Sequence, residues 1–451
     1  MSGMGKMRRT GLGLGIAVLL ALAGWRGSLK EQATLPLPDN ARKSLSIVYW
    51  SEKQFMDEYG ASYKIHNPNV DIRVIPMMVF ETGKAARAIE NSVILEQKPD
   101  LIYSPSLVTE QVKAGKLLEL TALMKQDQIE LSQFSESALE ALRQTGGGNL
   151  LSLSPTLQTA ALYYNKTLFD RLQLPYPSDD MSWPSLLQLA KSAARTEDGK
   201  QLYGLDNNRS PRIWLSDYTT SIGAAAFSTD NREAKYTSPE FKAAFDEALD
   251  AFRSGAVYLP PETSEPTKTT TERLLRNKFI AGEAAMRIDT PGFINDLLNA
   301  ATLGIPSFDW KIVTEPVDPK RPGQSSSVLV GDQFAIMSDS PNQRAAWEFL
   351  KFITGPDMAA QLAKTKPGVL SIRNEAIRSI EGRTLDPFYA HKPFQTMSSR
   401  FPQPLARSIS QISDEEMLDI LYGRSTVDAG LQSMQSRVQT AIHQYAMSDA
   451  K

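Results

Sequence analysis

Two kinds of hydrophobic pattern alternate along the first part of the chain. Residues 45–50 form a short apolar run, and residues 70–74 alternate between apolar and polar side chains, as expected for β-strands. Between them, residues 55–63 carry an aromatic side chain every four positions, which is typical of an amphipathic helix. A second helix is expected at about 81–96 and a third strand at 100–103. This order predicts parallel strands joined by right-handed helical crossovers.

Another extended segment begins about one third of the way along the chain. Three glycines at 146–148 precede residues 151–159, in which apolar and small polar side chains alternate as in a strand. Tyr163-Tyr164 follows, and a helix with apolar residues at helical spacing comes directly after it. A long strand that leads into new helices predicts a chain that crosses from one lobe into another.

Composition narrows the class of protein. The chain has 451 residues, of which 41% are hydrophobic and 22% charged, so it is typical of a soluble globular protein and too long for one ordinary core. Its net charge of −2 offers no broad basic field, and we expect no nucleic-acid partner. There is no cysteine and there are only three histidines, far apart in sequence. We therefore expect no metal site and no cofactor.

The N-terminus is predicted to direct export. Basic residues within 6–9 precede an apolar run, residues 12–24, that is too short for a comfortable membrane span. Because Ala21-Leu22-Ala23 is typical of a cleavage site, we predict a signal peptide over residues 1–25, followed by an extended tether over residues 26–43. An uncleaved N-terminal anchor is the alternative.

Residue 25 bears on how the protein is held at the cell surface. Residues 22–24 resemble the lead-in to the lipid-carrying cysteine of a lipoprotein, but Trp25 stands where that cysteine would be. The sequence therefore lacks the sulfur atom that would carry the lipid. We predict an exported protein that is extracellular or periplasmic and associated with the cell surface.

Several ordered blocks carry a resemblance to one family. The first, residues 146–194, has a strand, Tyr-Asn-Lys, a Leu-Phe helix, a loop, and a tryptophan that opens a helix. The second is residues 279–293, a small-residue turn and strand followed by Asp-Thr-Pro. The third is residues 328–336 with the helix behind it, and residues 366–370 follow. In order and spacing the blocks resemble the bacterial extracellular solute-binding proteins, the maltose-binding-protein-like receptors of sugar ABC transporters.

The resemblance implies an α/β, two-lobed periplasmic-binding-protein-like fold with a multi-strand hinge and a ligand between the lobes. It places residues 44–155 and 290–328 in the first lobe. Residues 156–289 and 329–451 then form the second lobe, whose C-terminal helices include an apolar stripe over 427–442 that we expect to pack in the core. The implied function is that of an exported, monomeric substrate-binding protein. It would bind a sugar or oligosaccharide and deliver it to the membrane permease subunits of an ABC importer.

Candidate ligand-binding residues follow from the chemistry of sugar recognition, which needs aromatic faces for the sugar rings and planar polar groups for the hydroxyls. In open α/β sheets, ligands lie beyond the carboxyl ends of the strands, where two pairs of candidates occur. The resemblance adds residues on the rim of the second lobe and around the second crossing. The predicted set is Trp50, Glu52, Tyr103, Ser104, Arg212, Trp214, Asp289, Thr290, Phe293 and Asp332.

Core packing is the competing interpretation for several of these residues. Trp50 and Trp214 fit a ligand site and a hydrophobic core equally well, and Tyr103 is at the end of a buried strand. Asp289 fits the cap of a turn before a proline. The family often places a tryptophan after that proline, whereas this chain has Gly292 there.

A ferric-iron or other small-solute receptor is one alternative function. Adjacent tyrosines serve as phenolate ligands in iron-binding relatives of this fold, and Tyr163-Tyr164 would be that pair here. No nearby histidine completes a site, and neighbouring residues of a strand point to opposite faces, so we expect at most one of the two to face the cleft.

A secreted glycan-cleaving enzyme is the second alternative. The sequence contains no Gly-x-Ser-x-Gly elbow, no His-Glu-x-x-His helix and no phosphate-binding loop. Glu52 with Asp289 is the carboxylate pair to test for glycoside hydrolysis. Nothing in the sequence favours hydrolysis over binding, and we predict no catalytic residue.

Overall fold

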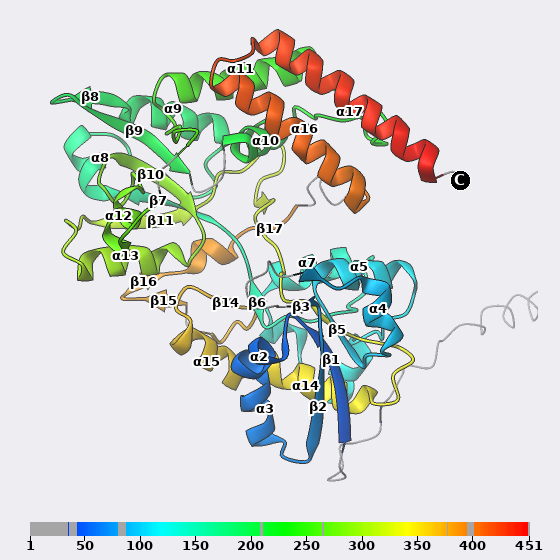
Figure 1. Cartoon of the computed structure of the whole chain (residues 1–451). Helices are drawn as coiled ribbons and strands as arrows, with labels where there is room; N and C mark the ends of the chain where they lie inside the picture. Colours follow the sequence, from blue (N-terminus) through cyan, green and yellow to red (C-terminus); the bar gives the residue numbers. More distant parts are fainter. Residues whose placement is uncertain are drawn as a thin grey trace, which may run out of the picture.

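The structure is a computed structural model that describes residues 35, 43–79, 87–207, 211–263, 266–376, 378–394 and 401–449. Within these ranges the chain forms two α/β lobes, which lie one above the other in Figure 1 and are joined by short strands. The predicted signal peptide and nearly all of the predicted tether lie outside the described residues. Among the residues that are described, no helix is both long enough and apolar enough to cross a membrane.

A four-stranded sheet in the order β13-β5-β1-β2 forms the centre of the first lobe. β1 (Lys43–Tyr49) pairs in parallel with β2 (Val70–Pro76) and with β5 (Leu101–Tyr103), as predicted. β13 (Phe334–Ile336) completes the sheet and runs antiparallel to β5. The carboxyl ends of β1 and β5 therefore lie at the same edge of the sheet as the start of β13.

The helices of the first lobe pack around this sheet. The aromatic residues of the predicted first helix are buried, and Phe55 and Tyr63 contact Phe349 at ring-centroid distances of 5.6 and 5.1 Å. In the second predicted helix, about 81–96, residues 91–96 are helical and residues 87–88 form a strand, while residues 81–86 lie outside the described ranges. The helical elements are α2 (Glu52–Phe55), a π-helical turn (Met56–Gly60), α3 (Ala61–His66), α4 (Asn91–Glu96), α5 (Pro105–Lys113), α6 (Thr121–Gln126), η2 (Leu131–Gln133), α7 (Glu136–Thr145), α14 (Gln343–Ile353) and α15 (Pro356–Thr365).

The second lobe is built on a five-stranded sheet in the order β11-β7-β10-β9-β8. β10 is parallel to β9, and the other neighbouring pairs are antiparallel. The strands are β7 (Ala161–Asn165), β8 (Arg195–Glu197), β9 (Lys200–Asn207), β10 (Ala284–Asp289) and β11 (Trp310–Thr314). The helices are α8 (Lys166–Leu172), α9 (Trp183–Ala193), α10 (Pro211–Ser221), α11 (Pro239–Arg253), α12 (Thr270–Leu275), α13 (Phe293–Thr302), α16 (Gln403–Leu421) and α17 (Val427–Asp449).

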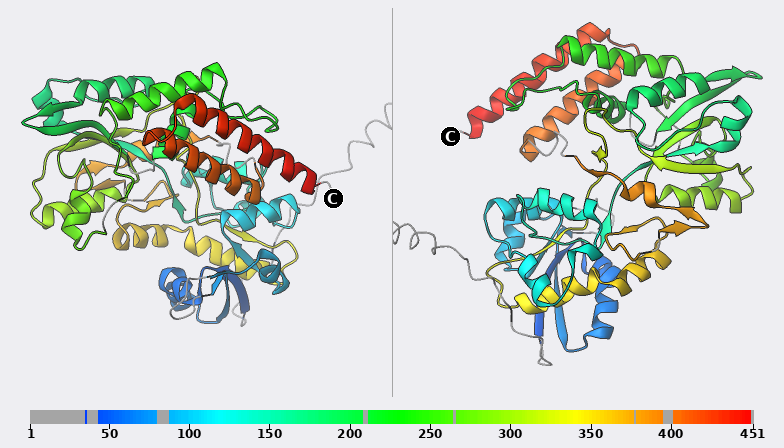
Figure 2. Two further views of the ribbon diagram at one scale, coloured as in Figure 1. Left: turned by 45° about the horizontal axis from the view of Figure 1, so that its top comes forward. Right: turned by 180° about the vertical axis from the view of Figure 1, so that it is seen from behind.

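The C-terminal helices cover the outer side of the second lobe (Figure 2). Leu431, Met434 and Val438 of α17 are buried in the core of that lobe, which confirms the predicted apolar stripe. Lys242 of α11 forms an ion pair with Asp428 at the start of α17. Both apolar packing and an ion pair therefore hold the C-terminal helix against the second lobe.

Short strands join the two lobes. β6 (Thr156–Leu157) pairs with β14 (Leu370–Ser371), and β12 (Gln324–Ser325) pairs with β17 (Lys392–Pro393). Isolated bridges add Leu153 to Phe334 and Gln158 to Leu329, so the outgoing and returning chains run side by side in opposite directions. The remaining short elements are β3 (Met78–Val79), β4 (Arg87–Ala88), β15 (Ser379–Ile380), β16 (Arg383–Thr384) and η3 (Asp386–Tyr389).

The strand pairing corrects the predicted boundaries of the lobes in the returning half of the chain. The sequence places residues 290–328 in the first lobe and residues 329–451 in the second. In the structure, β11 pairs with β7 of the second lobe and β13 pairs with β5 of the first. The chain therefore remains in the second lobe through Thr314, and α14 belongs to the first lobe, where it packs on the sheet. Local patterns identify a strand but not its partner strands, which explains why the sequence places this crossing too early.

Candidate functional site

A cleft of about 470 Å³ lies between the two lobes. The first lobe and the hinge strands supply most of its lining, and the second lobe contributes residues 290–292. The lining residues are Tyr49, Trp50, Gln54, Glu58, Tyr59, Tyr103, Thr156, Leu157, Gln158, Thr159, Thr290, Pro291, Gly292, Asp332, Leu362, Lys366, Gly368, Val369 and Leu370.

A chain of hydrogen bonds runs along the first-lobe wall of this cleft. The indole N–H of Trp50 donates to the hydroxyl of Tyr103 at 3.0 Å, and that hydroxyl donates to Oδ1 of Asp332 at 2.6 Å. The hydroxyl of Thr156 donates to Oδ2 of the same carboxylate at 3.1 Å. The orientation of Asp332 is therefore fixed from both sides, by the sheet of the first lobe and by a hinge strand.

Strand topology explains why residues so far apart in sequence meet here. Trp50 and Tyr103 come at the carboxyl ends of two parallel strands, so they lie at one edge of the sheet. β13 runs the other way and pairs Phe334 with Tyr103, which places Asp332, two residues earlier, beside that tyrosine. The bridge between Leu153 and Phe334 brings the hinge strand that carries Thr156 to the same point.

A second carboxylate of the cleft has a cation beside it. The hydroxyl of Tyr49 donates to Oε2 of Glu58 at 2.6 Å, and Nζ of Lys366 lies 3.2 Å from Oε1. The Lys366 and Glu58 side chains are 45% and 31% exposed, so solvent screens this pair. It supplies one acceptor and one donor at the edge of the cleft.

The phenols of the cleft act as neutral hydrogen-bond groups. Burial is the main reason that the pKa of Tyr103 lies above its usual range, and the nearby charge of Asp332 adds to it. Burial likewise raises the pKa values of Tyr49 and Tyr59. These hydroxyls therefore stay protonated at neutral pH, and those of Tyr49 and Tyr103 orient the carboxylates of Glu58 and Asp332.

Trp50 differs from the other aromatic residues of the cleft in its exposure. Its side chain is 40% exposed, whereas Tyr59 and Tyr103 are 2% and 3% exposed. Those two tyrosines therefore have little ring surface open to a ligand. Trp50 keeps an indole ring partly open at the cleft, held in place by its hydrogen bond to Tyr103.

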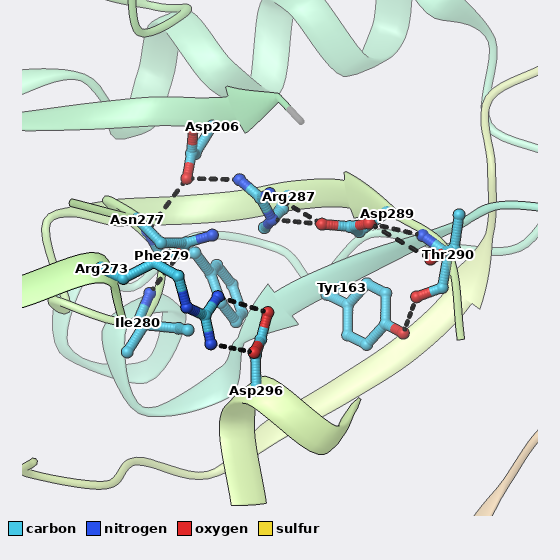
Figure 3. A network of polar contacts seen from close by, with 10 residues as sticks. All are labelled: Tyr163, Asp206, Arg273, Asn277, Phe279, Ile280, Arg287, Asp289, Thr290 and Asp296. Carbon is cyan, nitrogen blue, oxygen red and sulfur yellow. Dashed lines mark hydrogen bonds and ion pairs between the residues drawn. The ribbon is translucent and has the colours of Figure 1, made fainter. Parts of the chain in front are cut away.

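A buried charge network holds the second-lobe side of the cleft (Figure 3). The guanidinium of Arg287 lies 2.6 Å from Oδ2 of Asp206 and 2.7 Å from Oδ2 of Asp289. Asp289 in turn accepts the backbone N–H of Thr290 at 2.7 Å, and the hydroxyl of Tyr163 donates to the Thr290 carbonyl at 2.8 Å. Thr290 is thus positioned at the cleft by a network that is itself buried.

Two glycines allow the lobes to approach closely at one side of the cleft. Gly368 has φ +84°, and a Cβ on it would lie 2.8 Å from the Cα of Gly292 and from the Pro291 carbonyl oxygen. The side-chain amide of Asn295 donates to the Pro367 carbonyl at 2.5 Å. A first-lobe loop therefore packs directly on the segment in which the family often carries a tryptophan.

The chain matches the model of a protein family described as "Bacterial extracellular solute-binding protein" over residues 49–360, which is more than half of its length. It belongs to this family. The match begins at the last residue of β1 and extends into α15, so it includes β2 to β13 and most of the residues that line the cleft.

Solved structures share the fold of this solute-binding protein. A sugar transporter from Rhizobium etli in an open conformation has a TM-score of 0.59 and 19% identity, with 88% of this chain and 99% of that chain covered. The sugar-binding protein MalE from Xanthomonas citri has a TM-score of 0.64 and 15% identity, with coverage of 90% and 99%. UgpB from Mycobacterium tuberculosis, in complex with glycerophosphocholine, has a TM-score of 0.56 and 16% identity, with coverage of 89% and 99%. Such low identities establish the two-lobed fold alone.

The structure of this solute-binding protein brings four of the predicted site residues together at the cleft. They are Trp50, Tyr103, Thr290 and Asp332. Tyr103 takes part through its hydroxyl, while its ring packs against the sheet. The residues come from both lobes, as a ligand gripped between them requires.

Other predicted site residues do not line the cleft. Glu52 is exposed at the start of α2, and the hydroxyl of Ser104 caps α5 by accepting the N–H of Leu107 at 3.4 Å. The carboxylate of Asp289 is occupied by Arg287 and Thr290. These residues lie at or just after strand ends, but Ser104 and Asp289 bond to local partners, and Glu52 is exposed to solvent.

Two predicted aromatic site residues belong to the core. Trp214 is 1% exposed and stacks on Tyr218, with ring centroids 5.6 Å apart and an interplanar angle of 8°. Phe293 is 4% exposed and packs edge-on against Tyr163. The packing interpretation of Trp214 is therefore correct, and Phe293, expected only as a ligand-binding residue, belongs to the core instead. The side chain of Arg212 lies outside the described residues.

Sequence reasoning misses several residues of the cleft. The sequence pattern does not identify Tyr49 and Tyr59 as cleft residues, because their spacing fits core positions equally well. Glu58 is missed because it lies between core positions of the same helical segment. Lys366 stands in a loop that the family resemblance already marks. The alternating pattern of residues 156–159 shows a strand, but the side chains that face the cleft are decided by its partners.

The tyrosine pair does not form an iron site in this protein. Tyr163 is buried, its hydroxyl donates to the Thr290 carbonyl, and burial holds its pKa well above the usual range. Tyr164 points to the other face of the strand and packs against Phe169, with ring centroids 5.6 Å apart. Across the described part of the chain, no group of three or more His, Cys, Asp or Glu side chains could hold a metal ion.

The carboxylate pair considered for glycoside hydrolysis is not assembled either. Glu52 is exposed outside the cleft, and Asp289 is buried against Arg287. Hydrolysis needs two carboxyl groups on either side of one bond. This pair therefore cannot act together on a sugar in the cleft.

Proposed function

We propose that this solute-binding protein captures a sugar or oligosaccharide in the cleft between its lobes and delivers it to the permease subunits of an ABC importer. The observation that carries the proposal is the wall formed by Trp50, Tyr103 and Asp332. The partly exposed indole of Trp50 offers a surface for the C–H face of a sugar ring. Asp332, held by Tyr103 and Thr156, offers a fixed acceptor for hydroxyl groups.

Further polar groups support recognition of a ligand with several hydroxyl groups. Gln54, Gln158 and Thr159 line the same cleft and supply donors and acceptors. Two of the structural neighbours are a sugar transporter and a sugar-binding protein, which agrees with this ligand class.

Delivery would use closure of the lobes. A ligand held by the first lobe gains contacts from residues 290–292 of the second lobe, so it shifts the equilibrium towards a closed form. The closed form would dock on the permease, with ATP hydrolysed by a separate subunit. We propose an exported monomer at the cell surface, with Trp25 in place of a lipid-carrying cysteine.

A ligand screen tests this function. Thermal unfolding and tryptophan fluorescence of the purified protein are measured against a panel of mono- and oligosaccharides, with ferric citrate and short peptides as controls. We expect one sugar to raise the melting temperature in a dose-dependent way and to be recovered chemically intact. Trp50→Ala should need a higher sugar concentration for the same shift, while Glu52→Gln, which changes an exposed residue outside the cleft, should leave the dose dependence unchanged. A response confined to iron or peptides would reject the sugar proposal.

A further inference from the structure

Asp332 is a cleft carboxylate that, among the described residues, accepts hydrogen bonds but forms no ion pair. It is half-buried, and each of its oxygens accepts one bond, from Tyr103 at 2.6 Å and from Thr156 at 3.1 Å. Within the described residues, no lysine or arginine forms an ion pair with it. Since each carboxylate oxygen can accept two hydrogen bonds, the group keeps both its charge and acceptor capacity for a ligand.

The other charged groups among the described lining residues do not neutralise the negative charge of Asp332. Lys366 is the ammonium group among the described lining residues, and it pairs with Glu58 at 3.2 Å. Two carboxylates therefore face one ammonium group, and the described lining keeps a formal charge of about −1.

Among the described residues, the second lobe contributes only the uncharged Thr290, Pro291 and Gly292 to the lining of the cleft. Arg287, the cation nearest to Thr290 in the buried network, already has two carboxylate partners, Asp206 and Asp289. Its guanidinium also lies over the ring of Phe293, 4.6 Å from the ring centroid. Closure of this lobe would remove water from Asp332, and none of the described second-lobe residues that line the cleft would bring a cation to it. A partly desolvated carboxylate without a cation is unfavourable.

The ring of Trp50 adds a second feature that suits a cation. Its indole N–H is bonded to the same Tyr103 hydroxyl that holds Asp332, so the ring and the carboxylate are separated by one side chain. Indole is the aromatic group that attracts cations most strongly, through the negative face of its ring. A partly exposed indole and an uncompensated carboxylate thus stand together on one wall.

We propose that the ligand carries a positive charge, as an ammonium group on a sugar or polyol, and that this group binds against Asp332 and the ring of Trp50. The inference rests on the proposed function, because it takes the interlobe cleft as the ligand site. An ammonium group gains a Coulomb attraction to the Asp332 carboxylate that a neutral hydroxyl donor lacks. The charge would therefore decide which of two otherwise similar ligands is captured.

Matched pairs of ligands test the proposal. Calorimetric titrations of the purified protein compare glucosamine with glucose, galactosamine with galactose, and choline with its uncharged carbon isostere, at a mildly acidic pH where the amines are protonated. In at least one pair we expect the cation to bind about tenfold more tightly or better. Asp332→Asn should remove the preference, Asp332→Glu should restore part of it, and Glu52→Gln should leave it unchanged. Melting temperatures of the variants verify that each is folded.

The outcomes separate the inference from the function on which it rests. If neutral sugars bind as tightly as their cationic partners, or if the preference survives in Asp332→Asn, the inference is wrong and the proposed function stands. If no member of any pair and no sugar of the wider panel binds, both the inference and the proposed function are wrong.

Discussion

Trp50 and Trp214 are the same residue type in opposite settings. Trp50 follows β1 at the open edge of a sheet and is 40% exposed, whereas Trp214 lies in α10 and is 1% exposed. Both follow apolar neighbours in sequence, Tyr49 before Trp50 and Ile213 before Trp214, so an apolar context alone does not separate their roles. Whether a tryptophan is available to a ligand or packs in the core therefore depends on its place in the tertiary structure.

Alanine at each of these tryptophans should therefore have a different effect. Trp50→Ala is expected to weaken ligand binding about tenfold or more with little loss of stability, since its ring is not part of the core. Trp214→Ala should lower the free energy of unfolding by about 3–5 kcal/mol, because it leaves a large cavity, yet should preserve affinity in the folded fraction. Urea unfolding and calorimetry on both variants measure the two effects. Loss of affinity in Trp214→Ala at full folding would contradict the assignment of this residue to the core.

At the scale of one element, β10 shows how a strand end becomes part of a site. Its last residues place Arg287 and Asp289 on one side, where the arginine is shared with Asp206 of β9. β9 and β10 are parallel, and Arg287 pairs with Asp206 in the ladder, so these charges meet because of the register. The network then presents Thr290 to the cleft.

Arg287→Met should show how much the stability of the protein depends on this buried network. Two buried carboxylates would lose their guanidinium, and we expect the free energy of unfolding at neutral pH to fall by about 3–5 kcal/mol. Burial already raises the pKa of Asp206, and without Arg287 the folded-state pKa of this acid rises further. An acid whose pKa is raised in the folded state stabilises the fold below its unfolded pKa, and that stability is lost as pH rises through the folded pKa. The deficit should therefore be largest at neutral pH and shrink at acidic pH.

Urea unfolding at neutral and mildly acidic pH measures this dependence. Arg273→Met is the matched control, since that guanidinium pairs with Asp296 at 2.9 Å on the surface, where the two side chains are 51% and 36% exposed (Figure 3). The control should lose less than about 1 kcal/mol at either pH. An equal deficit for Arg287→Met at both pH values would show that the two carboxylates are not what destabilises it.

At the scale of the whole molecule, the two lobes touch at the cleft and are joined by paired hinge strands. β6 pairs with β14, and the bridge between Gln158 and Leu329 lies next to the cleft. Thr156 belongs both to this hinge and to the support of Asp332. A ligand on the first-lobe wall therefore lies directly against the segment about which the lobes would rotate.

Ligand binding should make the whole molecule more compact. A ligand identified by the screen, at a hundredfold excess over its Kd, should stabilise the protein by about 2.7 kcal/mol and reduce the radius of gyration measured by small-angle X-ray scattering. A sugar that does not bind serves as the control, and Trp50→Ala should need a higher concentration for the same change. An unchanged radius of gyration at saturation would reject closure of the lobes.

The sequence by itself determines the local elements and the class of fold. The parallel strands β1, β2 and β5, the apolar stripe of α17, and the position of Trp50 and Tyr103 at strand ends all follow from periodicity. The reason is physical: the pleat of a strand and the turn of a helix impose their period on neighbouring residues. The resemblance to the family adds the prediction of two lobes with a cleft between them.

Only the tertiary structure decides which distant segments pair. β13 joins β5 and so places Asp332 beside Tyr103, while β11 joins β7 and keeps its segment in the second lobe. The same pairing gives Asp289 a buried arginine and removes it from the site. Backbone hydrogen bonds between strands are alike for every sequence, so the choice of partner depends on how whole faces pack, which no local pattern encodes.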